Sequence, residues 1–445
     1  MTGTGPGLRL AALLATVILA GLTPAVPVPG TVHPADSAVT QSAPVRPAVY
    51  RAPGSATPGS TVHGASARIP AVASRAPATG AREPAVTHRE ERIDTPAGPV
   101  TTDVVVADLT APGVRATLLT GAAVGERATV AEHADRAGAA AAVNGDFFDL
   151  GRSNAPAGPS VRDGRALTSA VPPGRRLAPA VPGALPGDVL AVDAGGTARL
   201  DRLTLDAAVR GPTGTLPVDT LNAYAVPQDG IGLITPDWGG TDRNATLCGS
   251  DTDRDAPCAA DRIEVAVVDG RVTAVRPPGA GPVGPGESIL VGRDRGAAAL
   301  RELAPGDPLR VRYRLAAGSG VAPRTAVGGS PILRDGAPVP GLDDAARDPR
   351  SAAGVTADGR LVLATADGRE STSAGATLAE TAQLLRRAGA VDGVNLDGGG
   401  SSTLAFRPPG ADRVQVVNAP SEDAYRLVPN ALGVLSSGGL SSGDR

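Results

Sequence analysis

The sequence contains no lysine, and all 42 of its basic residues are arginines. A chain without lysine has no Walker phosphate loop, no Schiff-base catalysis and no lysine general base. Histidine is scarce too: there are four, and His33, His63 and His88 precede the first clear strand pattern while His133 lies in an expected helix. A Ser-His-Asp triad or a multi-histidine metal site is therefore a poor explanation, and acid–base chemistry falls to Asp and Glu.

Aromatic residues make up only 2% of the chain, so the core must be built mainly from Val, Leu, Ile and Ala. The hydrophobic content of 42% suffices for a sizeable core. The net charge of -3 gives no reason to expect a nucleic-acid partner or an anionic membrane surface. A length of 445 residues allows about three average domains as an upper bound.

The N-terminal region is typical of export. An apolar run at residues 10–22 follows Arg9, and Thr23 and Ala25 are small residues suited to cleavage, so residues 1–25 are expected to be a signal peptide. Membrane contact is expected only through this segment, if it stays uncleaved. The protein should then be secreted or held in the cell envelope, where Cys248 and Cys258 are better explained as a disulfide than as a nucleophile.

Composition divides the rest of the chain. Residues 26–91 are rich in Pro, Ala, Ser, Thr and Gly without periodicity, which predicts a disordered or extended linker. Residues 92–436 are expected to form the folded domain, and residues 437–445 a flexible tail. The oligomeric state is not indicated by the sequence.

Within the folded domain, short β-like runs dominate between residues 158 and 315, and two capping boxes predict helices. Thr129 with Glu132 begins the first helix and Gly138 ends it; Thr377 with Glu380 begins the second, which ends at Gly389. The single tryptophan, Trp238, is interpreted as a core residue. We expect an α+β fold with mixed β-sheets and few helices: one catalytic domain whose β-rich middle region folds over the site as a subdomain.

One pattern occurs twice, as RAGAAAAVNGD at 136–146 and RAGAVDGVNLD at 387–397. Each copy places an Asn and an Asp where a strand ends. We hypothesise that the two units lie side by side in one sheet and bring Asn144, Asp146, Asn395 and Asp397 to a common edge. The second copy continues into Gly398, Gly399, Gly400 and Ser401, a polar turn that allows close approach to a ligand.

Two such carboxylates support two kinds of chemistry. Asp146 and Asp397 could act as acid and base, or acid and nucleophile, at a glycosidic centre. Alternatively they could hold Ca²⁺ or Mg²⁺ that neutralises a phosphate. The sequence does not choose between them.

These residues resemble the phosphodiester glycosidase family, the family of N-acetylglucosamine-1-phosphodiester α-N-acetylglucosaminidase. The resemblance spans about residues 102–435, in matching order and spacing. Its most specific segments are VNGDFF at 143–148, GGSPILRDG at 328–336, PRSAAG at 349–354, ADGR at 366–369, the run from 377 to 403, NAP at 418–420 and VPNALGV at 428–434.

The resemblance implies hydrolysis of a sugar 1-phosphodiester to free sugar and a phosphomonoester. It also implies which residues line the pocket: Asn144, Gly145, Asp146, Phe147, Gly328, Gly329, Arg350, Asn395, Asp397, Gly398, Gly399, Gly400 and Ser401. Glycine N–H groups and hydroxyls would contact phosphate oxygens, and Arg350 and Arg426 are the candidate arginines. Where the family pattern has His before Pro-Arg, this chain has Asp348.

Two functions remain in competition. The first is a secreted or envelope-associated hydrolase of glycosyl phosphodiesters in exopolysaccharide or cell-wall polymer. The second is a non-catalytic module that binds glycan or phosphate, which the missing histidine favours and the two Asn-x-Asp motifs disfavour. A third possibility, a purely structural envelope protein, is ranked last because it gives no reason for the polar residues at the strand ends.

Overall fold

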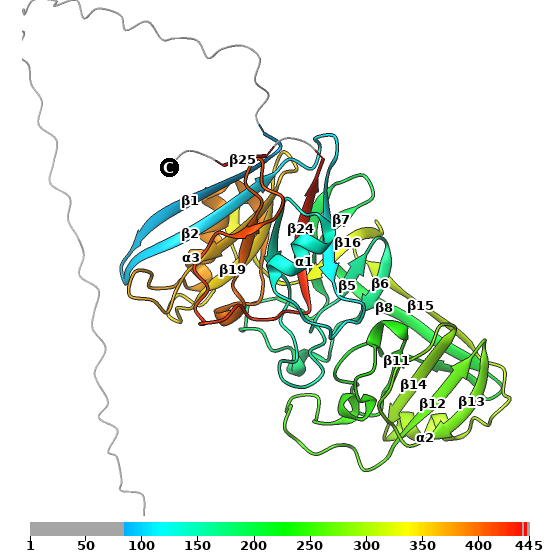
Figure 1. The fold of residues 1–445 in the computed structure, drawn as a ribbon. Coiled ribbons are helices and arrows are strands. Elements are labelled where there is room, and N and C mark those ends of the chain that lie inside the picture. Colours follow the sequence, from blue (N-terminus) through cyan, green and yellow to red (C-terminus); the bar gives the residue numbers. More distant parts are fainter. Residues whose placement is uncertain (1–83, 438–439, 443–445) are drawn as a thin grey trace, which may run out of the picture. The chain divides into compact units, whose positions relative to one another are not determined.

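The computed structural model describes residues 84–437 and 440–442 (Figure 1). The expected signal peptide and most of the expected linker lie outside these residues. Within the described ranges the fold is mostly β, with four sheets and three α-helices, as expected from the sequence. None of these helices combines the length and apolar composition needed to cross a bilayer.

The largest sheet has eight strands, and its central strand β20 (Leu361–Ala366) is buried on both faces. Along β20, Leu361 and Leu363 belong to one hydrophobic core, while Val362 and Ala364 belong to another, as the alternation of a strand requires. All neighbouring strands are antiparallel except β1 and β25. In spatial order the strands are β18 (Ala337–Pro338), β17 (Ser330–Arg334), β21 (Ala390–Asn395), β19 (Arg350–Thr356), β20 (Leu361–Ala366), β2 (Gly98–Ala107), β1 (Val86–Thr95) and β25 (Leu440–Ser442).

A five-stranded sheet shares the first of these cores. Val143 and Leu432 from this sheet pack in the same cluster as Leu363 and Val394 of the large sheet. Its strands are β23 (Gln415–Val416), β22 (Leu404–Phe406), β4 (Ala141–Asn144), β24 (Asn430–Ser436) and β3 (Val114–Thr120).

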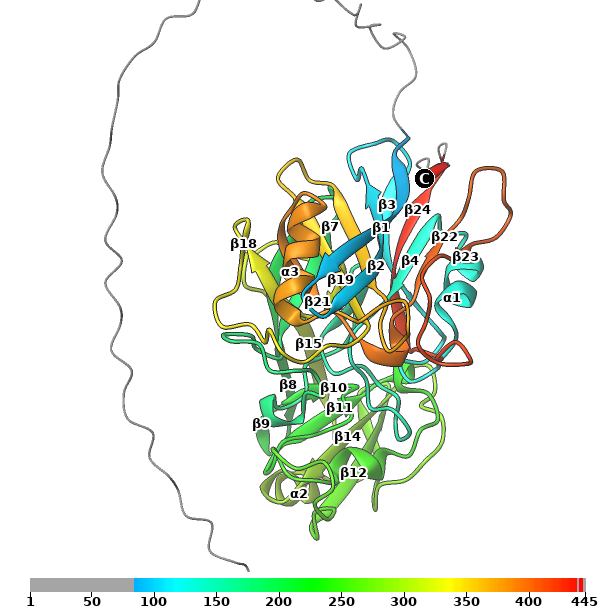
Figure 2. The same cartoon turned by 90° about the vertical axis from the view of Figure 1, so that its left-hand side faces the viewer.

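Helix α3 (Leu378–Arg387) covers the other face of the eight-stranded sheet, and Figure 2 shows it lying beside β19 and β21. Its buried Leu378, Ala382 and Leu385 belong to the second core. Both expected capping boxes are present, and α1 (Val130–Ala137) ends at the left-handed Gly138 as predicted. The two helices therefore begin where the sequence indicated, because capping is a local interaction.

The middle of the chain forms the two remaining sheets. The seven-stranded sheet consists of β15 (Arg310–Ala317), β8 (Ala198–Gly211), β7 (Asp188–Asp193), β16 (Pro323–Gly328), β5 (Ser160–Arg162) and β6 (Arg165–Thr168), with β9 (Gly214–Pro217) paired to β8. The other sheet consists of β10 (Thr220–Leu221), β11 (Ile231–Ile234), β14 (Glu287–Arg293), β12 (Arg262–Val268) and β13 (Arg271–Arg276). Four short 3-10 helices are described, at Pro173–Arg175, Pro236–Trp238, Arg243–Leu247 and Gly399–Ser401.

Several expectations for this middle region are met. Trp238 is 1% exposed and packs in the first core, with its indole N–H donating to the carbonyl of Thr241 at 3.0 Å. Cys248 and Cys258 form the expected disulfide. Helix α2 (Arg295–Arg301) was not expected; its Ala297 and Leu300 are buried, and Leu300 packs in the core of the smaller sheet.

Two sequence boundaries need correction. The folded part begins at β1, so residues 86–91 are strand and not linker. This strand is polar and owes its conformation to pairing with β2 along its whole length, a non-local interaction that composition does not reveal. The expected tail also contains β25, which pairs with β1 at Val86 and Leu440.

Candidate functional site

The two Asn-x-Asp segments meet, but not in one sheet. Strand β4 lies in the five-stranded sheet and β21 in the eight-stranded sheet, so the hypothesis of neighbouring strands was wrong. The strand ends instead converge across the core that the two sheets share. The backbone N–H of Asp397 donates to the carbonyl of Gly145 at 3.0 Å, and Nδ2 of Asn144 donates to the carbonyl of Asp397 at 2.7 Å.

Asn144 ties three segments of the site together and is fully buried. Its Oδ1 accepts from the hydroxyl of Ser351 at 2.7 Å and from the N–H of Thr403 at 3.1 Å. With Nδ2 on Asp397, the side-chain amide joins β4, β19 and the glycine turn. Asn144 therefore positions the site from within the protein.

Asp146 is sealed in the interior, with a side chain that is 0% exposed. Its Oδ1 pairs with Nη2 of Arg176 at 2.8 Å and accepts from the N–H of Phe147 at 2.9 Å; Oδ2 accepts from the N–H of Gly158 at 2.6 Å. Burial raises the pKa of Asp146, opposed by Arg176 and by these two N–H groups. The ion pair and the hydrogen bonds of this buried carboxylate are therefore all made to groups of the protein itself.

Glycines are required around Asp146 because the backbone comes so close to it. A Cβ on Gly328 would lie 2.2 Å from Oδ2 of Asp146, and one on Gly158 would lie 2.6 Å from the same atom. Gly145 is restricted by Asn430, whose Oδ1 would lie 1.9 Å from an added Cβ. These glycines let three segments close over the carboxylate.

Asp397 differs from Asp146 because it is only half-buried. Burial raises its pKa to about 7, and the charge of Asp146 adds to that rise. Hydrogen bonds from Ser401 and from the N–H of Gly398, together with the charge of Arg426, work in the opposite direction. Asp397 is thus a partly exposed residue whose carboxyl group has a pKa near neutral pH.

The glycine turn after Asp397 is held by the protein itself. Gly399, at φ 58°, donates its N–H to the carbonyl of Pro349 at 2.8 Å, and the N–H groups of Ser401 and Ser402 donate to Gly398 and Gly399. These three N–H groups therefore form hydrogen bonds within the protein and are not free to bind a phosphate. At Gly400, a Cβ would lie 2.1 Å from Oε1 of Glu422 and 2.4 Å from Nη2 of Arg426.

The two candidate arginines are placed differently. Arg426 reaches the site: its Nη1 donates to the hydroxyl of Ser401 at 3.3 Å, and its Nη2 pairs with Glu422. Arg350 is 4% exposed and donates to the carbonyls of Ala376 and Ala346, each at 3.0 Å. These hydrogen bonds hold the segment before β19 in place. The structure therefore gives Arg350 a positioning role.

Arg369 is a site residue that sequence reasoning missed, although it ends the ADGR motif. Its Nη2 would lie 3.3 Å from a Cβ on Gly399, so its guanidinium stands over the glycine turn. The residue is in the left-handed region at φ 60°, a conformation uncommon outside glycine. Its partner is Asp348, the residue at the expected family histidine, whose Oδ1 accepts from Nη2 at 2.8 Å.

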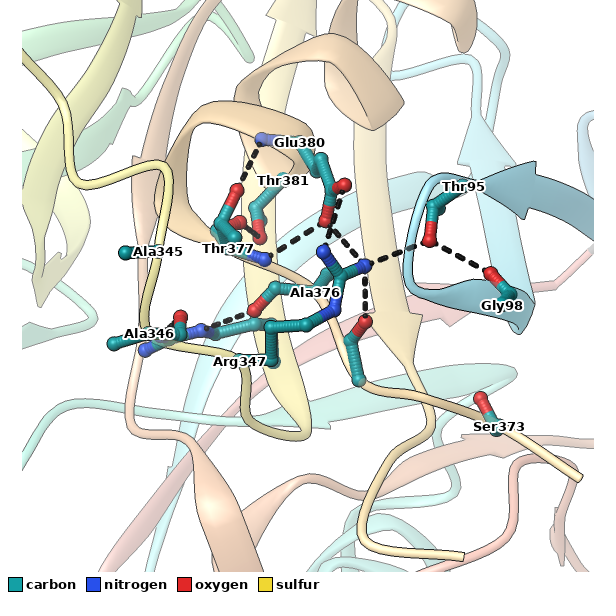
Figure 3. A network of polar contacts seen from close by, with 12 residues as sticks. Thr95, Gly98, Ala345, Ala346, Arg347, Ser373, Ala376, Thr377, Glu380 and Thr381 are labelled. Carbon is teal, nitrogen blue, oxygen red and sulfur yellow. Dashed lines mark hydrogen bonds and ion pairs between the residues drawn. The ribbon is translucent and has the colours of Figure 1, made fainter. Parts of the chain in front are cut away.

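A second layer of polar contacts holds the segment before Asp348 (Figure 3). Arg347 binds both carboxylate oxygens of Glu380, at 3.0 and 2.7 Å, and also donates to the hydroxyl of Thr95 and the carbonyl of Gly375, each at 2.9 Å. Glu380 is at the same time part of the capping box of α3 with Thr377. The helix start therefore anchors the loop that carries Asp348.

Asp367 links the ADGR loop to the segment after the glycine turn. Its Oδ1 accepts from Nδ2 of Asn418 at 3.2 Å and from the N–H of Ala419 at 3.1 Å. Asn418 in turn donates to the carbonyl of Ser402 at 3.1 Å. Burial raises the pKa of Asp367 to about 7, and the hydrogen bonds from Ala419 and Asn418 oppose the rise.

The remaining expected pocket residues are buried next to the site. Phe147 is 9% exposed and packs in the first core, and Gly329 lies so close to Val394 that a Cβ would meet its side chain at 2.8 Å. Asn395 is 1% exposed and donates from Nδ2 to the carbonyl of Leu396 at 2.9 Å. Arg176 and Asn430, which sequence reasoning also missed, are the main new contacts of Asp146 and Gly145.

The residues do not fit the Ca²⁺ or Mg²⁺ alternative. The guanidinium of Arg176 pairs with the Asp146 carboxylate at 2.8 Å, where it would repel a cation. Among the described residues, no three His, Cys, Asp or Glu side chains converge in a way that could hold a metal ion. Hard cations take six or more oxygen ligands, or several waters held by carboxylates, and Asp397 alone supplies one such group.

Residues 262–435 match the model of the phosphodiester glycosidase family, so the family expected from the sequence is confirmed for this part of the chain. It contains Asp397, the glycine turn, Arg369 and Arg426. Asp146 and the preceding strand β4 lie outside the matched residues. A comparison with curated proteins finds no match.

Solved structures share the fold. A hypothetical protein from Synechocystis is 23% identical with a TM-score of 0.64, over 79% of this chain and 62% of that one, so this chain spans less than two thirds of it. A Burkholderia pseudomallei protein named as exported is 27% identical with a TM-score of 0.59, over 76% and 74% of the two chains. The catalytic domain of zebrafish N-acetylglucosamine-1-phosphodiester α-N-acetylglucosaminidase, at 13% identity and 80% and 85% coverage, has a TM-score of only 0.37.

Proposed function

We propose that the protein hydrolyses a sugar 1-phosphodiester, releasing the free sugar and leaving a phosphomonoester. The observation that carries the proposal is the half-buried carboxyl of Asp397, with a pKa of about 7, in a turn that also holds the guanidinium of Arg426. Arg369 brings a second guanidinium over the same turn. A proton-transferring group beside two cations suits a reaction that expels a phosphate.

In the proposed reaction Asp397 acts as a general base. It takes a proton from water as the water oxygen bonds to the anomeric carbon. The bond from that carbon to the bridging oxygen breaks, and its electron pair leaves with the phosphate. The departing phosphomonoester is an anion that needs no proton to leave, and the guanidinium groups of Arg426 and Arg369 stabilise its charge.

Asp146 takes a different part in this proposal from the one expected of a catalytic pair. Its carboxylate is enclosed by Arg176, Phe147 and Gly158, so it does not touch the substrate. Its negative charge raises the pKa of Asp397 and so strengthens that residue as a base. Asp146 is therefore a positioning and tuning residue.

We further propose that the reaction takes place outside the cytoplasm, in the processing of exopolysaccharide or cell-wall polymer. Three observations support this location. The N-terminal sequence has the pattern of a signal peptide, Cys248 and Cys258 are joined in a disulfide, and a protein of similar fold from Burkholderia pseudomallei is named as exported. Disulfides persist mainly in oxidising compartments.

The test is the release of reducing sugar from N-acetylglucosamine 1-phosphodiesters. Asp397→Asn should lower kcat about 100- to 10,000-fold, the usual contribution of a general base. Asp392→Asn is the matched control, because it removes the same charge from β21, the strand that leads to Asp397, and keeps an oxygen for the N–H of Asp335. Activity equal in the wild type and Asp397→Asn would remove Asp397 from the mechanism.

The competing function, a non-catalytic module that binds glycan or phosphate, makes a different prediction. It is motivated by Asp348, which stands at the expected histidine and is paired with Arg369. Binding of the phosphodiester without release of sugar by the wild-type protein would support the binding module over the hydrolase.

A further inference from the structure

The pair formed by β8 and β15 carries a row of arginines on one face. The antiparallel register places Arg310 opposite Arg210, Arg312 opposite Ala208, and Arg314 opposite Asp206. Because side chains alternate along a strand, these six residues share a face. The opposite face, which includes Val209 and Val311, packs into the core of the smaller sheet.

The charges on this face are poorly compensated. Arg314 pairs with Asp206 at 2.7 Å, but within the described residues no carboxylate lies within ion-pair distance of Arg210, Arg310 or Arg312. Arg310 and Arg210 stand directly opposite each other, an arrangement of like charges that destabilises a sheet. Four arginines and one aspartate make the face strongly positive, in a chain whose net charge is -3.

The face is hollowed as well as charged. It lines a groove of about 1130 Å³, to which Pro212 in the loop after β8 and Thr215 in β9 also contribute. The groove lies along β15, which is an edge strand of its sheet. An exposed arginine is usually just solvated, but uncompensated arginines gathered in one groove form a site for a polyanion.

We propose that this groove binds the phosphodiester backbone of the polymeric substrate, so that the protein acts on an anionic glycan chain and not on a small glycosyl phosphodiester alone. This inference rests on the proposed function. Arg310 and Arg312 are two positions apart on the same face of β15, so they stand about 6.8 Å from each other. This spacing lets them contact successive negative groups of one polymer chain. Guanidinium groups bind phosphate in a bidentate manner, and an intervening phosphate relieves the repulsion between Arg310 and Arg210.

Phosphate-bearing glycan is favoured over nucleic acid because the groove offers a single stacking group. Tyr313, which is 42% exposed, is the one aromatic among the residues that line this groove, and the alternation along β15 puts it on the other face from the arginines. The residues that share the face with the arginines are Ala208 and Asp206, and the β9 residues paired to this part of β8 are Thr215 and Pro217. Single-stranded nucleic acid is normally held by aromatic side chains on which its bases stack. Recognition here is of the charged backbone.

The test compares the full-length wild type with the double variant Arg310→Gln/Arg312→Gln. The probe is a labelled poly(glycerol phosphate) carrying N-acetylglucosamine, and the dissociation constant is measured by fluorescence polarisation at low salt. The double variant should bind about tenfold more weakly. Arg295→Gln/Arg301→Gln, which removes the same charge from exposed positions on α2, should bind as the wild type does.

Binding is measured with Asp397→Asn added to every protein, so the result does not depend on turnover. If the proposed function fails, no sugar is released from any substrate, yet the affinity difference still decides this inference. With active proteins, the double variant should lose about tenfold in kcat/KM on the polymer and keep its kcat/KM on the small phosphodiester. Equal polymer affinity in the double variant and the wild type, an equal loss in the α2 variant, or equally tight binding of DNA would overturn the inference.

Discussion

At the scale of single residues, Asp397 and Asp146 show how burial divides the roles of two similar carboxylates. Both follow an Asn at the end of a strand, and both have a raised pKa. Asp146 is surrounded by donors and closed off, whereas Asp397 keeps access to solvent. In the proposed reaction the same local pattern therefore serves positioning at one copy and proton transfer at the other.

The pKa of Asp397 predicts the pH dependence of activity. A general base works only when ionised, so kcat/KM should be low at pH 5 and rise tenfold per pH unit until it levels off near pH 7, the pKa set by burial. The profile is measured with the small N-acetylglucosamine phosphodiester. A profile that falls as the pH rises through 7 would instead assign Asp397 the part of a general acid.

Arg369 illustrates a residue whose importance is visible only in three dimensions. Its left-handed backbone and its pairing with Asp348 bring the guanidinium over Gly399. The Asp348 found in place of histidine is thus the partner of a cation at the site. In the sequence alone, Arg369 is simply the last residue of the turn after β20.

At the scale of elements, the glycine turn depends on the loop that carries Glu422 and Arg426. An added Cβ at Gly400 would collide with the ends of both side chains. Both are flexible, so Gly400→Ala should displace Arg426 from Ser401 without unfolding the protein. We expect kcat/KM to fall about tenfold or more, the effect of losing one charged contact to phosphate, with little change in melting temperature.

The matched control for that prediction is Gly279→Ala, where an added Cβ meets nothing within 4 Å and the backbone is not left-handed. Activity and melting temperature should both stay at wild-type values there. If Gly400→Ala keeps full activity, the placement of Arg426 by the turn is not needed for the reaction.

At the scale of the whole molecule, buried carboxyl groups make the stability of the fold depend on pH. Burial raises the pKa of Asp367 in the folded protein to about 7, from an ordinary value of 3.8. The folded state therefore holds this proton over a range where the unfolded state has lost it. The stabilisation is complete below about pH 4 and is lost as the pH rises through 7, with an upper limit of about 4 kcal/mol.

Asp367→Asn tests this linkage because the amide oxygen can still accept from Asn418 and Ala419. Relative to the wild type, the variant should gain free energy of unfolding as the pH is raised from 5 to 8. Urea unfolding followed at several pH values measures the difference. Parallel curves for the two proteins would show that Asp367 does not titrate as its burial implies.

The sequence by itself determined the parts of the protein that depend on local or compositional signals. The two capping boxes predicted the starts of α1 and α3, Trp238 was assigned to the core, Cys248 and Cys258 were paired, and the motifs around Asp397 indicated the family. Each of these follows from residues close together in the chain or from a characteristic motif.

Only the tertiary structure decided what depends on distant segments. It placed β4 and β21 in different sheets, made a strand of the polar residues 86–91 through pairing with β2, and brought Arg176 to Asp146 and Arg369 to Gly399. Strand pairing, burial and ion pairs depend on residues that are far apart in the chain, so the local sequence pattern does not predict them. For that reason the sequence supplied two candidate carboxylates, and the fold decided which one is fully buried and which one is partly exposed.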